Sequence, residues 1–112
     1  MNPRRLVPAL ALGVASMAQA TGSGAPASVH LACEPVYLPA RGVWARTVDI
    51  AYDQKKVRSV LIDGVPVYTF AVRGTTILTA LDNERIQIDV AALSWRSDFR
   101  GVASSEGRCE RG

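Results

Sequence analysis

The chain has 112 residues, of which 48% are hydrophobic and 21% charged, and its 13 basic and 10 acidic side chains give a net charge of +3. This length provides one small domain and excludes an organisation in several domains. A hydrophobic core of that size confers modest stability, so a covalent cross-link would be of use.

The N-terminal residues 1–20 carry the three parts of a secretory signal peptide. Arg4 and Arg5 form a basic start, residues 6–18 form an apolar segment too short to span a bilayer, and Ala18-Gln19-Ala20 has the pattern of a cleavage site. We therefore expect cleavage after Ala20. The mature protein is then expected in the periplasm or outside the cell, with no membrane span in the mature chain.

The positive charge belongs mostly to this segment. Cleavage removes Arg4 and Arg5, two of the 13 basic residues, and leaves 11 against 10 acidic ones, so the net charge falls from +3 to +1. Nucleic acids and anionic membrane surfaces are bound by clustered basic faces, and a nearly neutral chain therefore does not favour either partner.

The two cysteines, Cys33 and Cys109, lie near opposite ends of the mature chain. In an oxidising compartment such a pair forms a structural disulfide. Closing a loop of this length stabilises a fold by roughly 4 kcal/mol in the chain-entropy model. The alternative for Cys33 is a lipoprotein processing site at residues 30–33, but the apolar segment ends far upstream of it.

The mature chain divides into a leader and a β domain. Residues 21–28 contain only Gly, Ser, Ala, Pro and Thr, which bury little apolar area, and we expect a flexible segment there. Residues 29–112 consist of short runs rich in Val, Ile, Thr and aromatic residues, each bounded by Gly, Asp, Asn or Pro. Short apolar runs separated by turn-forming residues are typical of an antiparallel β protein.

A first hairpin is predicted around Asp63-Gly64, because a tight type I′ turn needs positive φ at both positions. A longer turn at residues 53–56 precedes it. A two-residue turn at Asp63-Gly64 and a four-residue turn at residues 53–56 fix the strand register, and with this register most apolar side chains of the three strands lie on one face. The predicted pairs are Leu61–Pro66, Ser59–Tyr68, Val57–Phe70, Tyr52–Val57, Ile50–Ser59 and Val48–Leu61.

A second hairpin is predicted with Asn83-Glu84 as its turn. Asp82 then faces Arg85, and the apolar residues of 77–81 align with those of 86–90. After a short connection at 91–93, Trp95, Ser97 and Phe99 alternate with charged residues, which indicates a strand with one inward face. Six to eight short strands closed by one disulfide predict an all-β fold, a small antiparallel barrel or sandwich.

Few groups in the chain are suited to catalysis or metal binding. The only histidine, His30, lies next to the leader, and four acids, Asp53, Asp63, Asp82 and Asp89, fall at predicted turns or outward positions. A structural zinc needs four close ligands, which two cysteines and one histidine do not provide. We therefore expect neither an enzyme nor a cofactor.

Aromatic and arginine side chains are the remaining candidates for ligand binding. They are Tyr37, Trp44, Arg96 and Arg100. Arginines between aromatic residues recognise phosphates, carboxylates or sugars, although strict alternation also places Arg96 and Arg100 on a solvated face. Trp44 follows a Pro- and Gly-containing loop, where it is either an exposed anchor or a plug at the end of a barrel.

The layout resembles that of small periplasmic β-domain proteins of Gram-negative bacteria. The residues that carry this resemblance are Cys33 early in the first strand, Ile62-Asp63-Gly64 in the middle and Gly107-Arg108-Cys109 at the end, and they cover most of the mature chain. The layout is also distantly similar to the bacterial inhibitors of C-type lysozyme, which are small envelope β barrels. The Ser-Gly-x-x-Tyr segment that those proteins insert into the lysozyme cleft is absent here, so the likeness implies architecture alone.

These features favour a non-enzymatic binding module whose ligand is an envelope protein or a glycan. The alternatives are a structural or accessory subunit of the envelope and a lysozyme-inhibitor-like protein. An exposed concavity lined by Trp44 or Tyr37 would favour binding, and a long unpaired apolar strand edge would favour a subunit.

Overall fold

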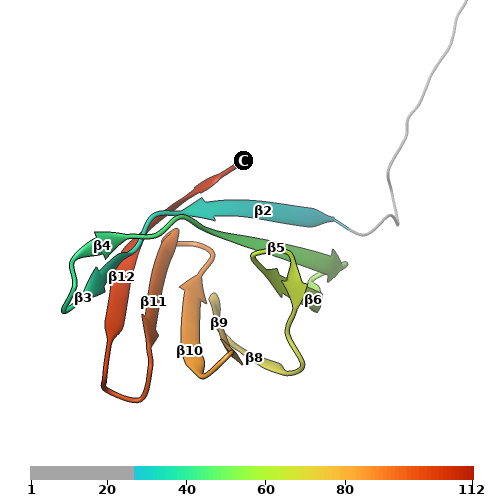
Figure 1. Ribbon diagram of the computed structural model, residues 1–112. Helices are drawn as coiled ribbons and strands as arrows, with labels where there is room; N and C mark the ends of the chain where they lie inside the picture. Colours follow the sequence, from blue (N-terminus) through green and yellow to red (C-terminus); the bar gives the residue numbers. More distant parts are fainter. Residues whose placement is uncertain (1–26) are drawn as a thin grey trace, which may run out of the picture.

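The computed structural model describes residues 27–112, and in this part of the chain the strands form one curled antiparallel sheet (Figure 1). The predicted signal peptide and most of the predicted leader lie outside the described residues. The described segment contains no helix that is long and apolar enough to cross a membrane. Its strands are β2 (Ser28–Cys33), β3 (Val36–Leu38), β4 (Gly42–Val43), β5 (Arg46–Asp53), β6 (Lys56–Ile62), β7 (Val65–Pro66), β8 (Phe70–Arg73), β9 (Thr76–Leu81), β10 (Glu84–Asp89), β11 (Ser94–Asp98) and β12 (Ser104–Arg111).

The all-β prediction is confirmed, and the sheet is a half-barrel with the strand order β7-β6-β5-β2-β12-β11-β10-β9-β8. The order shows two meanders, which meet where the first strand, β2, pairs with the last, β12. Cys33 lies opposite Cys109 in this pairing, and their sulfur atoms are bonded. The predicted disulfide therefore joins the two meanders where they meet.

The eleven strands within residues 27–112 exceed the predicted six to eight because longer strands are interrupted. β2 and β3 pair with β12 in one register, as the pairs Cys33–Cys109 and Tyr37–Ser105 show. Pro35 lies between them and cannot donate a ladder hydrogen bond. It faces Gly107 so closely that a Cβ at Gly107 would lie 2.6 Å from the carbonyl oxygen of Glu34. This approach requires glycine at position 107.

The first hairpins follow the prediction at their turn and depart from it further along. Leu61 pairs with Pro66 across the Asp63-Gly64 turn, whose two residues have φ of 54° and 81°. A β-bulge between Ala51 and Tyr52 then shifts the register of β5 against β6 by one residue. As a result Ile50 pairs with Val60 and Val48 with Ile62, and the predicted Ile50–Ser59 and Val48–Leu61 pairs are wrong.

The predicted continuation of this hairpin through Tyr68 and Phe70 is also wrong. β7 ends at Pro66, Tyr68 is fully exposed, and β8 pairs with β9 instead of β6. The predicted Ser59–Tyr68 and Val57–Phe70 pairs therefore do not form. A proline without an amide hydrogen weakens the ladder at this point, and the chain crosses over at residues 67–69.

The turn of the β9–β10 hairpin lies one residue earlier than predicted. Its central residues are Asp82 and Asn83, with φ of 52° and 69°, and Leu81 pairs with Glu84. Aspartate and asparagine adopt positive φ more readily than glutamate, which explains the choice. The earlier turn moves the pairing by two residues, so the apolar residues of β9 and β10 still share one face as predicted. Glu84 now lies within β10, two residues before Ile86, and therefore shares this inward face.

The core lies on the inner face of the curl. On β11 the predicted alternation is confirmed, since Trp95 is 1% exposed whereas Arg96 is exposed. Burial of this inner face is the main stabilising contribution to the fold. The fully buried apolar residues are Leu31, Cys33, Val48, Ile50, Val60, Ile62, Ile77, Ile86, Ile88, Trp95 and Cys109.

Candidate functional site

A buried ion pair crosses the inside of the half-barrel. Arg46 begins β5 and Glu84 begins β10, and they are 4% and 3% exposed. Arg46 Nη1 donates to Glu84 Oε1 over 2.8 Å, and Arg46 Nε donates to Asp63 Oδ2 over 2.7 Å. The guanidinium thus links the β6–β7 turn, on one meander, to the start of β10 on the other.

Three hydroxyl groups complete the surroundings of Glu84, and we call Tyr37, Arg46, Glu84, Ser97 and Ser105 the inner cluster. Tyr37 and Ser97 each donate to Glu84 Oε2 over 2.6 Å. Because the Ser97 hydroxyl is used in this way, Ser105 donates to Ser97 at 2.5 Å, and it accepts from Trp95 Nε1 at 2.9 Å. Both carboxylate oxygens of Glu84 therefore have donors, as a buried charge requires.

The guanidinium of Arg46 lies between two indole rings. Its Cζ is 4.6 Å from the ring centroid of Trp44 and 4.9 Å from that of Trp95, which is favourable for a cation–π interaction. Trp44 also packs on Tyr37, with ring centroids 5.4 Å apart. Although Trp44 is 54% exposed, its ring covers the solvent side of the inner cluster.

The inner cluster keeps Arg46 charged and Tyr37 neutral. Burial, and next the hydrogen bond to Glu84, raise the pKa of Tyr37. Burial acts to lower the pKa of Arg46, but the hydrogen bonds to Glu84 and Asp63 outweigh it and raise that pKa. Because the phenol is neutral and the carboxylate is fully paired, we assign this cluster a structural role, namely to maintain the curvature of the sheet.

The four sequence-predicted site residues fall in three separate places. Tyr37 belongs to the inner cluster and Trp44 covers it. Arg96 is on the outer face of β11, where its Nη2 donates to Glu106 Oε2 over 2.9 Å between side chains 66% and 71% exposed. Arg100 lies in the β11–β12 loop with a positive φ of 54°. They do not form one site.

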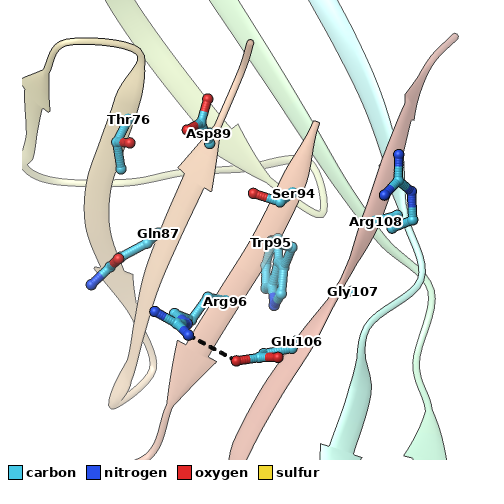
Figure 2. Close-up of a pocket in the computed structure, with 9 residues that line it drawn as sticks. All are labelled: Thr76, Gln87, Asp89, Ser94, Trp95, Arg96, Glu106, Gly107 and Arg108. Carbon is cyan, nitrogen blue, oxygen red and sulfur yellow. Dashed lines mark hydrogen bonds and ion pairs between the residues drawn. The ribbon is translucent and has the colours of Figure 1, made fainter. Parts of the chain in front are cut away.

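A groove of about 540 Å³ lies on the outer face of β10, β11 and β12, and Figure 2 shows the residues that line it. The Arg96–Glu106 pair lies in it, flanked by Gln87 and Asp89 of β10 and by Arg108 of β12. Asp89 accepts hydrogen bonds from Thr75 and from the backbone of residues 91 and 92. The lining is therefore polar, and its charged groups are largely engaged within the chain.

A second hollow, of about 530 Å³, lies on the same outer face between Arg96 and the β3–β4 hairpin. Val36, Leu38 and Val43 are 40%, 49% and 65% exposed beside it. Val43 is directly opposite Val36, so their side chains share a face. We call the exposed surface formed by Val36, Leu38, Val43, Arg96, Asp98 and Glu106 the hairpin face.

The sequence interpretation missed the aliphatic part of the hairpin face. Val36 and Leu38 flank Tyr37 in a strict alternation that could have revealed it, since an inward Tyr37 requires two outward aliphatic neighbours. Arg96 was named from the sequence as a candidate binding residue. Its position next to β3 follows from the pairing of Val36 with Glu106 on β12, which the sequence does not show.

The only histidine, His30, makes an exposed contact with an acidic side chain. His30 Nδ1 lies 2.5 Å from Asp49 Oδ1 on the surface. Across residues 27–112, no group of three or more His, Cys, Asp or Glu side chains is arranged to hold a metal ion. A comparison of the chain with protein-family models, curated proteins and solved structures finds no match.

Proposed function

We propose that this chain is an exported, non-enzymatic binding protein of the bacterial cell envelope and that it binds another protein through the hairpin face. The observation that carries the proposal is the exposure of Val36, Leu38 and Val43 on one face beside the Arg96–Glu106 pair. Single exposed aliphatic residues are common on protein surfaces, whereas a contiguous group rimmed by charges is typical of a contact surface.

The choice of a protein over a glycan rests on the kind of side chain that is exposed. Aliphatic groups bury apolar area against another protein, with charged groups at the rim of the contact. The aromatic rings suited to stacking on a ligand, those of Tyr37 and Trp44, are engaged with Arg46 and with each other. A glycan ligand would be expected to need these rings free.

Export is supported by the signal-peptide features of residues 1–20 and by the Cys33–Cys109 disulfide, which is compatible with an oxidising compartment. Mass spectrometry of the periplasmic fraction tests it. We expect a mature N-terminus at Thr21, and a chain that keeps Met1 or carries a lipid on Cys33 would contradict the proposal.

Capture from envelope extract by the tagged mature protein tests the binding surface. Val43→Asp places a charge in the hairpin face, and the matched control Val65→Asp changes another exposed valine, 46% exposed, on β7. We expect Val43→Asp to weaken capture of a specific protein roughly fivefold or more, as for a contact residue at the centre of an interface, with Val65→Asp unchanged. Equal capture by both variants, with circular dichroism showing both folded, would remove the hairpin face as the site.

A further inference from the structure

The two outer edges of the curled sheet differ in their chemistry. The edge of β6 and β7 carries Lys56, Arg58 and Pro66, which are residues that discourage pairing with another strand. The opposite edge belongs to β8, with the sequence Phe-Ala-Val-Arg, and within residues 27–112 it pairs only with β9. β8 thus presents a largely apolar open edge.

The backbone groups of Phe70 and Val72 point toward this open edge. β8 and β9 are joined by the two-residue turn Gly74-Thr75, so the flanking pair Arg73–Thr76 is hydrogen-bonded. Hydrogen-bonded and non-bonded pairs alternate along an antiparallel ladder. The backbone N–H and C=O of Ala71 therefore point toward β9. Those of Phe70 and Val72 point away from β9, toward the open edge. No other described strand reaches them.

The side chains along this edge are also incompletely covered. Val72 pairs with Ile77, a core residue that is 1% exposed, and therefore lies on the inner face of the sheet. Even so, Val72 is 47% exposed, because no strand of the described segment continues the sheet beyond it. An added strand would cover Val72 and satisfy the open backbone groups at the same time.

We propose that the β8 edge pairs with the same edge of a second copy of this chain, antiparallel about a two-fold axis at Ala71. In this register Phe70 faces the second copy's Val72, and the outward backbone groups of the two residues meet. Ala71 faces its own counterpart, where its small side chain avoids a clash. Arg73 faces the second copy's Thr69, so no like charges are opposed.

This self-complementarity is what favours a second copy over another occupant. A two-fold contact must place each residue opposite a residue of the same patch, and many edges fail because equal charges then meet. The pairing does not involve the hairpin face, so it stands or falls separately from the proposed function. Because the strand is short, we expect a dimer that dissociates on dilution.

Sedimentation velocity of the mature protein over a concentration series tests the proposal. The test variant is Val72→Lys, and the matched control is Val65→Lys, since these valines are 47% and 46% exposed. We expect wild type and Val65→Lys to pass from monomer to dimer as concentration rises, and Val72→Lys to stay monomeric. At a dilution where all three are monomeric, we expect Val72→Lys to keep the denaturation midpoint of wild type. A wild type that stays monomeric, or a Val72→Lys variant that dimerises normally, would overturn the proposal.

The register is tested at Thr69, which is exposed and adjoins β8. In the proposed dimer, Thr69→Glu faces the second copy's Arg73 and should tighten association, whereas Thr69→Arg opposes like charges and should weaken it, each by roughly twofold to fivefold. Equal effects of the two variants would exclude this two-fold register. Association through another surface would then appear as a dimer insensitive to both Thr69 and Val72.

Discussion

Arg46 on β5 donates a hydrogen bond to Glu84 on β10, with 2.8 Å between Nη1 and Oε1, although 38 residues separate them in the sequence. The two strands belong to different meanders of the half-barrel, and no ladder joins them directly. The indole rings of Trp44, which is partly exposed, and of Trp95, which is buried, both pack against the guanidinium of Arg46. This ion pair is therefore a polar link that holds the curled sheet closed.

Removing one partner of this pair should strongly destabilise the fold. Arg46→Met leaves Glu84 charged and 3% exposed, which we expect to cost about 3–5 kcal/mol of unfolding free energy. Replacing both residues, Arg46→Met with Glu84→Leu, should recover much of this loss because no lone charge remains. Urea denaturation measures each variant.

The control for Arg46 is Arg96→Met, which breaks the exposed pair with Glu106. Exposed pairs are screened by solvent, so this change should alter the unfolding free energy by at most about 1 kcal/mol. If Arg46→Met and Arg96→Met lowered the unfolding free energy by similar amounts, the buried ion pair would contribute no more to stability than the exposed one.

Gly107 should not tolerate even a methyl group. A Cβ there would overlap Pro35 Cα and lie 2.6 Å from the oxygen of Glu34, both backbone atoms of the neighbouring strand segment. We expect Gly107→Ala to lower the unfolding free energy by roughly 1–3 kcal/mol through overpacking. Gly42→Ala is the control, because nothing lies within 4 Å of the position that its Cβ would take, and the change should be nearly neutral. A neutral Gly107→Ala would mean that residues 34 and 35 do not pack this closely on β12.

Much of this architecture could be predicted from local signals. The Asp63-Gly64 turn determined the Leu61–Pro66 pair, the alternation around Trp95 identified the inward face of β11, and the positions of Cys33 and Cys109 indicated the disulfide. The turn and the alternation depend on residues close in sequence, and the disulfide prediction depends on the oxidising compartment expected from the signal-peptide features. They were sufficient for the fold class.

The inner cluster could not be predicted in the same way. The bulge at Ala51 and Tyr52 has no distinctive residue, and the choice of Asp82-Asn83 over Asn83-Glu84 as a turn moves Glu84 from the loop into the interior. The bulge reverses the face of β6 that pairs with β5, and the earlier turn adds Glu84 to the inward face of β10. The partnership of Arg46 with Glu84 then depends on the closure of the whole sheet, which no local pattern contains.

The raised pKa of Tyr37 predicts a loss of stability at alkaline pH. Burial and Glu84 favour the neutral phenol in the folded state, so the unfolded chain releases the Tyr37 proton first, near its ordinary pKa of 10.0. The stabilisation is complete below that pH and is lost as pH rises through the folded pKa. Comparing denaturation midpoints between about pH 8 and about pH 11 should show a smaller fall for Tyr37→Phe than for wild type. An identical fall would contradict the neutral, buried phenol.

The lowered pKa of Asp98 predicts a loss of stability in acid. A hydrogen bond from Arg85 is the main cause, and the carboxylate is therefore favoured in the folded state. Its contribution is present above the unfolded pKa and is lost as pH falls through the folded one. We expect the acid-induced drop in denaturation midpoint to be smaller in Asp98→Asn and, to a lesser degree, in Arg85→Gln, because the backbone hydrogen bond from Arg100 to Asp98 remains there. A drop as large as that of wild type in both variants would exclude this ion pair as a cause.

The central claim is that the hairpin face contacts another protein, and site-specific photocrosslinking in the cells that make this protein tests it most directly. A photoreactive amino acid replaces Val43 on the hairpin face or Lys55 in the β5–β6 turn, at the far end of β5 from Arg46. We predict a discrete crosslinked product at position 43, identifiable by mass spectrometry, and none at position 55. Products of equal yield at both positions, or none at position 43, would contradict the claim.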